Sequence, residues 1–73
     1  MNHSANRIGS HVTIPSCNVV NGLIIDQRDL DTELMVGVQR IITGYVGQYI
    51  VTAWYRLPIV DGEIPADYAT FAE

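Results

Sequence analysis

The stretch RIITGYVGQYIVTAWYR, residues 40–56, decides the fold of this 73-residue chain. Valine, isoleucine, threonine and aromatic residues dominate it, and these residue types favour β-strands. Gly47-Gln48 matches a two-residue hairpin loop, because glycine at the first loop position suits a type II′ turn. The stretch therefore predicts two antiparallel strands joined by a tight turn.

Successive residues of a strand point to opposite faces, so the predicted hairpin has two distinct faces. We expect one face to form the core, with Val38, Ile42, Val46, Tyr49, Val51, Ala53, Tyr55 and Leu57. The other face carries Gln39, Ile41, Thr43, Tyr45, Ile50, Thr52, Trp54 and Arg56. Its predicted cross-strand pairs, Ile41 with Trp54 and Tyr45 with Ile50, are unusual for a face that meets only water.

Large apolar side chains beside arginine are typical of the centre of a protein interface. We therefore predict a partner-binding surface made of Ile41, Tyr45, Ile50, Trp54 and Arg56. The alternative is that the same chain covers this face, and the C-terminal segment PADYATF, residues 65–71, is the candidate cover. Small domains of mixed structure commonly bury a sheet face in this way.

The rest of the chain predicts one small β domain at residues 7–73, after a disordered tail at residues 1–6. We expect a five-stranded barrel or a strongly bent antiparallel sheet that ends in a short helical turn. Residues 31–43 also fit an amphipathic helix, which would make the domain α+β. If this segment is a strand, Gly37 predicts a bulge or a bend.

Shorter signals mark the other elements. Short strands are expected near residues 12–14 and 22–26, with a turn at Asn21-Gly22 between them. Asp61-Gly62 predicts a second turn, followed by a strand at residues 63–64.

Four segments resemble SH3-like small β-barrel proteins: IGSHV at 8–12, Asn-Gly at 21–22, the central hairpin, and DGEIPADYATF at 61–71. The resemblance covers most of the chain and implies a five-stranded barrel. The opening spacing is similar to that of the plasmid-encoded trimethoprim-resistant dihydrofolate reductases, which are small homotetramers with a pore active site. Their Val-Gln-Ile-Tyr strand corresponds to residues 62–66, where this chain has GEIPA, so the resemblance does not imply that activity.

The chain is acidic, with a formal charge of −4 from four arginines, no lysine and eight acidic residues. This balance argues against general nucleic-acid binding, which depends on phosphate neutralisation, and against an anionic membrane surface. No apolar run approaches the roughly 20 residues that span a bilayer, and the N-terminal residues lack the features of a signal peptide. We expect a cytoplasmic protein, and the single cysteine, Cys17, fits a reducing compartment.

The residues that could carry chemistry are few. The segment DQRDLDTE predicts an acidic loop with Asp26, Asp29, Asp31 and Glu33, but it lacks the glycine of an EF-hand, so we expect no metal. Cys17 and His11 lack a third group that would orient the histidine. Asp61 and Glu63 lie in a turn signal. We therefore expect neither catalytic residues nor a cofactor.

A chain of this length buries only about 60% of its unfolded surface, so self-association is a reasonable source of extra stability. The sequence favours a non-catalytic protein-interaction module that self-associates, in the setting of a phage or mobile-element accessory protein that binds a host protein. The alternative is an oligomeric enzyme or a small-ligand-binding barrel with its site at the subunit interface.

Overall fold

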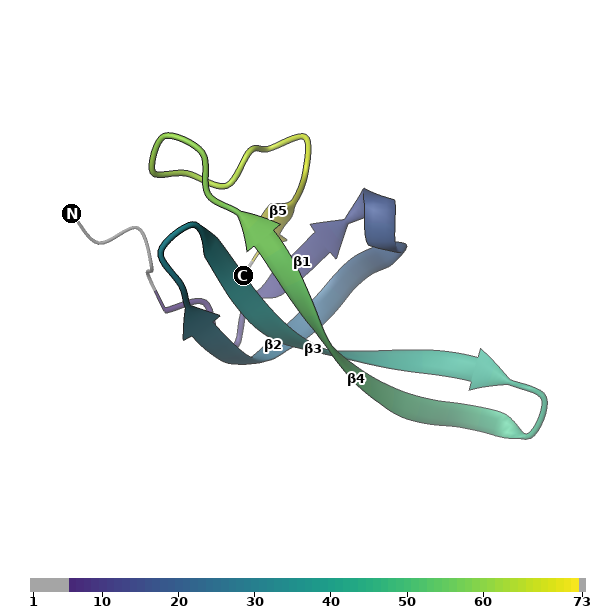
Figure 1. Ribbon diagram of the computed structural model, residues 1–73. Coiled ribbons are helices and arrows are strands. Elements are labelled where there is room, and N and C mark those ends of the chain that lie inside the picture. Colours follow the sequence, from purple (N-terminus) through teal and green to yellow (C-terminus); the bar gives the residue numbers. More distant parts are fainter. Residues whose placement is uncertain (1–5, 73) are drawn as a thin grey trace.

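The computed structural model describes residues 6–72 (Figure 1). Its strands are β1 (His11–Ile14), β2 (Val19–Asp29), β3 (Glu33–Gly44), β4 (Gly47–Pro58) and β5 (Thr70–Ala72). A 3-10 turn, η1 (Pro15–Cys17), connects β1 to β2. All neighbouring strands pair antiparallel in one sheet with the order β4-β3-β2-β1-β5. The predicted mainly β fold is confirmed as a bent sheet that does not close into a barrel.

The alternative helix over residues 31–43 is wrong, because β3 occupies nearly the whole segment. The inner half of β3 lies between β2 and β4, and it pairs with both. A helix would satisfy its own main chain but would leave the facing edges of β2 and β4 unpaired. Pairing with two neighbours therefore overrides the helical pattern of this segment.

The core lies inside the bend of the sheet. Its buried residues are Val12, Ile14, Val19, Ile24, Leu34, Val36, Val38, Leu57 and Ala69. In β1 and β3 they recur at every second position, as the alternation of a strand requires. Tyr68 and Phe71 of the C-terminal segment pack against this cluster. The C-terminal segment thus packs on the face of β4 that carries Leu57, opposite to the face that carries Trp54.

The loop of the central hairpin is Tyr45-Val46, two residues before the predicted turn at Gly47-Gln48. Ile41 is opposite Ile50, and Trp54 is opposite Gly37. The predicted cross-strand pairs are therefore wrong. Outside the loop, each residue nevertheless stays on its predicted face, because a register change by an even number of residues preserves the alternation.

Asn21-Gly22 is not the turn that its composition predicts, because it lies inside β2. Asn21 has a φ of 51° and forms a bulge opposite β1, where the register shifts between Val12 and Ile14. The Thr13 hydroxyl Oγ1 accepts a hydrogen bond of 3.1 Å from the Asn21 main-chain N–H. The chain reverses earlier, at η1, which ends on Asn18 in the left-handed conformation.

A second irregularity of β2 lies at Ile25, where the register against β3 shifts between Ile24 and Asp26. The bulge predicted at Gly37 is therefore on the facing strand. The turn at Asp61-Gly62 is confirmed: both residues have positive φ, and Val60 and Glu63 exchange main-chain hydrogen bonds of 2.7 and 3.0 Å. This geometry is that of a type I′ turn.

The fifth strand is Thr70–Ala72, which pairs with β1, rather than the predicted segment 63–64. The predicted helical turn precedes it, since the main-chain N–H groups of Tyr68 and Ala69 both donate to the Pro65 carbonyl. Residues 1–5 of the predicted N-terminal tail lie outside the described residues. At its last residue, Asn6, the side-chain oxygen accepts a hydrogen bond of 3.0 Å from the Ile8 N–H. Within residues 6–72, no helix has the length and apolar character needed to cross a membrane.

Candidate interaction site on the hairpin arm

The outer half of the β3–β4 hairpin projects away from the rest of the domain (Figure 1). β3 pairs with β2 only as far as Gln39, opposite Leu23, whereas its pairing with β4 continues to Gly44 and Gly47. We call residues 40–51 the arm. The arm is a two-stranded ribbon, and because of it the molecule measures 46 Å along its longest axis but 21 and 19 Å along the others.

Large apolar side chains are exposed on the arm. The opposed pair Ile41 and Ile50 is 68% and 63% exposed, and the loop residues Tyr45 and Val46 are fully exposed. Tyr49, on the other face, is 51% exposed. The sequence places Val46 and Tyr49 in the core, and this is wrong because no other described strand lies beneath the arm. The described residues therefore bury neither face of the arm completely, although Ile42 and Val51 are half-buried.

Trp54 lies at the base of the arm and is 45% exposed. It packs over Gly37, where an added Cβ would lie 3.6 Å from the indole ring. The Arg28 guanidinium carbon is 6.0 Å from the centre of the ring, and Met35 helps to enclose a shallow hollow of about 300 Å³. Trp54 is thus supported from one side and open to a partner on the other.

The structure places the predicted partner-binding residues in two groups. Ile41, Ile50, Trp54 and Arg56 share the face of the hairpin that turns away from the core. Tyr45 is at the tip of the arm. Arg56 lies opposite Met35, and its main-chain carbonyl accepts a hydrogen bond of 3.3 Å from the Tyr68 hydroxyl. The predicted residues therefore extend from the base of the arm to its tip, with the polar pairs Gln39–Thr52 and Thr43–Gln48 between them.

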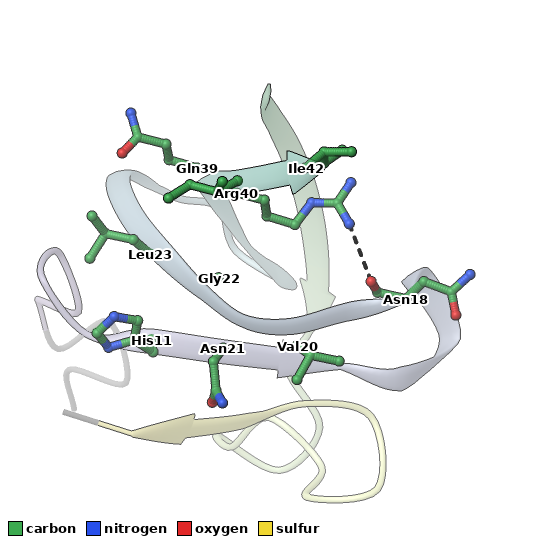
Figure 2. A pocket seen from close by; sticks show the side chains of 10 residues that line it. His11, Asn18, Val20, Asn21, Gly22, Leu23, Gln39, Arg40 and Ile42 are labelled. Atoms are coloured by element: carbon green, nitrogen blue, oxygen red, sulfur yellow. Dashed lines mark hydrogen bonds between the residues drawn. The ribbon is translucent and has the colours of Figure 1, made fainter. Parts of the chain in front are cut away.

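A notch opens where β3 leaves β2 (Figure 2). It has a volume of about 550 Å³, and residues 18, 20–23 and 39–42 line it together with His11. The Arg40 Nη1 crosses the notch and donates a hydrogen bond of 3.2 Å to the Asn18 carbonyl (Figure 2). Arg40 Nε is buried and has no partner within the described residues. Sequence reasoning missed this notch, because it forms where β3 diverges from β2 beyond the Leu23–Gln39 pair, and no local pattern marks that point.

The four residues of the predicted acidic loop are not in one loop. Asp26 and Asp29 lie on β2, Asp31 is in the turn, and Glu33 begins β3. The Gln27 main-chain N–H donates to the Asp26 carboxylate at 2.8 Å, and its side-chain amide donates to the Asp29 carboxylate at 3.2 Å. In the described part of the chain, no group of three His, Cys, Asp or Glu residues is placed to hold a metal ion.

His11 and Cys17 are separated by the length of β1, since His11 begins the strand and Cys17 ends the turn that follows it. Cys17 packs against the core, whereas His11 lines the notch. Asp61 belongs to the type I′ turn, and Glu63 closes that turn through its main chain. The structure does not bring the histidine and the cysteine together.

Comparison with known proteins gives no match: no family model, no curated protein and no solved structure is significantly similar to this chain. The geometry of the arm and of the notch is therefore the basis for assigning a function.

Proposed function

We propose that this chain is a non-catalytic protein-interaction module that self-associates through its hairpin arm. The observation that carries the proposal is the exposure of large apolar side chains on both faces of the arm, from Ile41 to Ile50. Large exposed apolar side chains gathered on one projecting element are typical of protein interaction sites on soluble proteins. A host protein bound in a mobile-element setting would use the same arm.

The arm also needs a partner on stability grounds. A two-stranded hairpin is marginally stable in water by itself, and at least a third strand or a packed face is normally required. The arm has neither among the described residues, apart from the bond between Arg40 and the Asn18 carbonyl at its base. Contact with another protein supplies the missing packing.

The test replaces Ile41 and Ile50 together by threonine, which keeps the preference for strands but removes the apolar contact. Val60→Thr is the matched control, because Val60 is an exposed aliphatic residue far from the arm in the turn before Asp61. We expect the wild-type chain and Val60→Thr to self-associate in sedimentation velocity over a wide concentration range, and the double variant to remain a folded monomer. A wild-type chain that stays monomeric at every concentration contradicts the proposal.

The notch favours a second candidate function, a small-ligand site that a second copy completes. Its apolar walls, from Val20 and Leu23, and the guanidinium of Arg40, whose Nε has no partner among the described residues, suit a small aromatic carboxylate. Benzoate is a suitable probe. Saturable shifts of the Gly22 and Gln39 amide resonances, lost in Arg40→Gln, would support this candidate. Shifts that do not saturate, or that survive in the variant, would exclude it.

A further inference from the structure

β4 is an edge strand along its whole length, since β3 is its only neighbour in the sheet that residues 6–72 form. Natural proteins protect exposed edges with lysine, proline, bulges or very short strands, because an unprotected edge pairs with another chain. From Gly47 to Tyr55, β4 contains no charged residue and no proline, and its pairing with β3 has no bulge. The edge of β4 is therefore long, regular and unprotected.

The hairpin geometry identifies the main-chain groups that this edge presents. Gly44 and Gly47 close a two-residue loop, so they exchange both main-chain hydrogen bonds. Hydrogen-bonded and non-hydrogen-bonded pairs then alternate along the ladder. The N–H and C=O groups that point away from β3 consequently belong to Gln48, Ile50, Thr52 and Trp54. At the next such position, Arg56, the carbonyl already accepts a hydrogen bond from Tyr68.

The charge distribution favours a second copy as the occupant. No charged residue lies between Ile41 and Tyr55, and all eight acidic residues lie outside residues 34–60. Two chains of net charge −4 repel each other least where their arms meet. Apart from Arg40 at its base, the arm carries no charge, so two identical acidic chains can approach there without bringing their carboxylates together.

The exposed apolar area of the arm and its base is also large enough for an interface with a second copy. The apolar residues of the arm and its base are Ile41, Tyr45, Val46, Tyr49, Ile50 and Trp54. If a fully accessible large side chain offers roughly 150–250 Å², their exposed fractions amount to about 650–1,100 Å² in each copy. A stable interface of standard size takes about 800 Å² from each partner. The arm and its base together therefore expose apolar area of the order that such an interface takes from one partner.

We propose that two copies pair through the edges of their β4 strands, antiparallel and around a two-fold axis at Val51. This inference rests on the proposed function and names its partner and its geometry. Val51 is the centre of the free edge between Gln48 and Trp54, so this register uses every free group. It places Ile50 opposite Thr52 of the second copy, Gln48 opposite Trp54, and Val51 opposite Val51. The two acidic domain bodies then lie at opposite ends of one continuous sheet.

Disulfide formation tests the position of the axis. In a Cys17→Ser background, Val51→Cys supplies the only cysteine. On the proposed axis, residue 51 of one copy lies opposite residue 51 of the second copy, and the two form a non-hydrogen-bonded pair. The two Cα atoms are then about 4.5 Å apart, within the range that a disulfide accepts. Tyr45→Cys is the control, because it is more exposed but the axis places the two tips roughly 40 Å apart.

We expect Val51→Cys to form a disulfide-linked dimer at least about tenfold faster than Tyr45→Cys under mild oxidation, because proximity and not exposure limits the reaction. Equal rates, or faster cross-linking at Tyr45→Cys, overturn the proposed edge pairing.

Proline substitution tests the edge by an independent route. Thr52→Pro removes one outward N–H, which an edge strand tolerates, and Thr52→Ala removes the side chain but keeps that N–H. We expect Thr52→Pro to raise the dimer dissociation constant at least about tenfold and Thr52→Ala to change it less than about threefold. If Thr52→Pro fails to fold, the cross-linking comparison decides alone.

The outcomes separate this inference from the proposed function. A wild-type dimer that tolerates Thr52→Pro, and that is lost in the double threonine variant of Ile41 and Ile50, associates through the faces of the arm. That result overturns the edge pairing and leaves the proposed function intact. A wild-type chain that is monomeric throughout overturns both.

Discussion

Gly22 offers the sharpest test of the packing, because it lies where β2 crosses the centre of the core. A Cβ added at this position would lie 2.3 Å from Val38 Cγ1 and 3.0 Å from Val19 Cγ1. Both valines are fully buried, and β2 pairs with β1 on one side and β3 on the other. Neither the valines nor the strand can move aside without breaking other contacts.

We expect Gly22→Ala to lower the free energy of unfolding by about 3 kcal/mol, at the upper end of the range for overpacked cores. For a domain of this size, 1 kcal/mol corresponds to about 4–8 °C in Tm, so the expected loss is roughly 12–24 °C. Val38→Ala removes the Cγ1 methyl group that the added Cβ would meet, so it should relieve the strain. In a double-mutant cycle, Gly22→Ala with Val38→Ala should therefore be more stable than the sum of the single changes by about 1 kcal/mol or more.

The measurement is thermal and urea unfolding, followed by the fluorescence of Trp54 and by circular dichroism at one fixed protein concentration, because association shifts apparent stability. Gly37→Ala is the matched control. It is also a buried strand glycine, but its added Cβ would meet Asp26 at 3.4 Å and Trp54 at 3.6 Å, which are ordinary contacts. We expect it to cost less than about 1 kcal/mol. Equal losses for the two glycines, or additive effects in the cycle, would refute this reasoning.

Three further predictions concern other parts of the chain. Gly62→Ala forces a side chain onto a φ of 81° and should cost about 1–2 kcal/mol in thermal unfolding; an unchanged Tm contradicts the type I′ turn. Arg40→Met removes the hydrogen bond to the Asn18 carbonyl, and we expect faster amide hydrogen exchange at the base of the arm with a stability loss below about 1 kcal/mol. Phe71→Ala removes core packing and the ring that Arg7 covers at 4.0 Å, so stability should fall by about 2 kcal/mol and the amides of β1 that face β5 should exchange faster. Unchanged exchange in β1 would show that β5 is not held by Phe71.

The turn between β1 and β2 shows where local sequence signals fail. The chain reverses at Asn18, whereas Asn21-Gly22, the predicted turn, lies inside β2. Asparagine followed by glycine predicts a turn because both residues accept positive φ, and Asn21 does have positive φ. The chain uses it for a bulge instead, because Gly22 must bring β2 close to Val38. The same backbone preference is satisfied by a turn or by a bulge, and only the packing of β2 distinguishes them.

The sequence by itself determined that the chain is mainly β and which residues share a face of the hairpin, because alternation is a local property that survives a change of register. It also determined that Ile41, Ile50 and Trp54 lie together away from the core. The tertiary structure alone decided how far the core extends. β2 stops pairing with β3 at Gln39, and therefore Val38 is buried while Tyr49, on the same face, is exposed. The end of the core along the hairpin depends on where β2 and β3 diverge, and the pattern of residues along one strand does not predict that point.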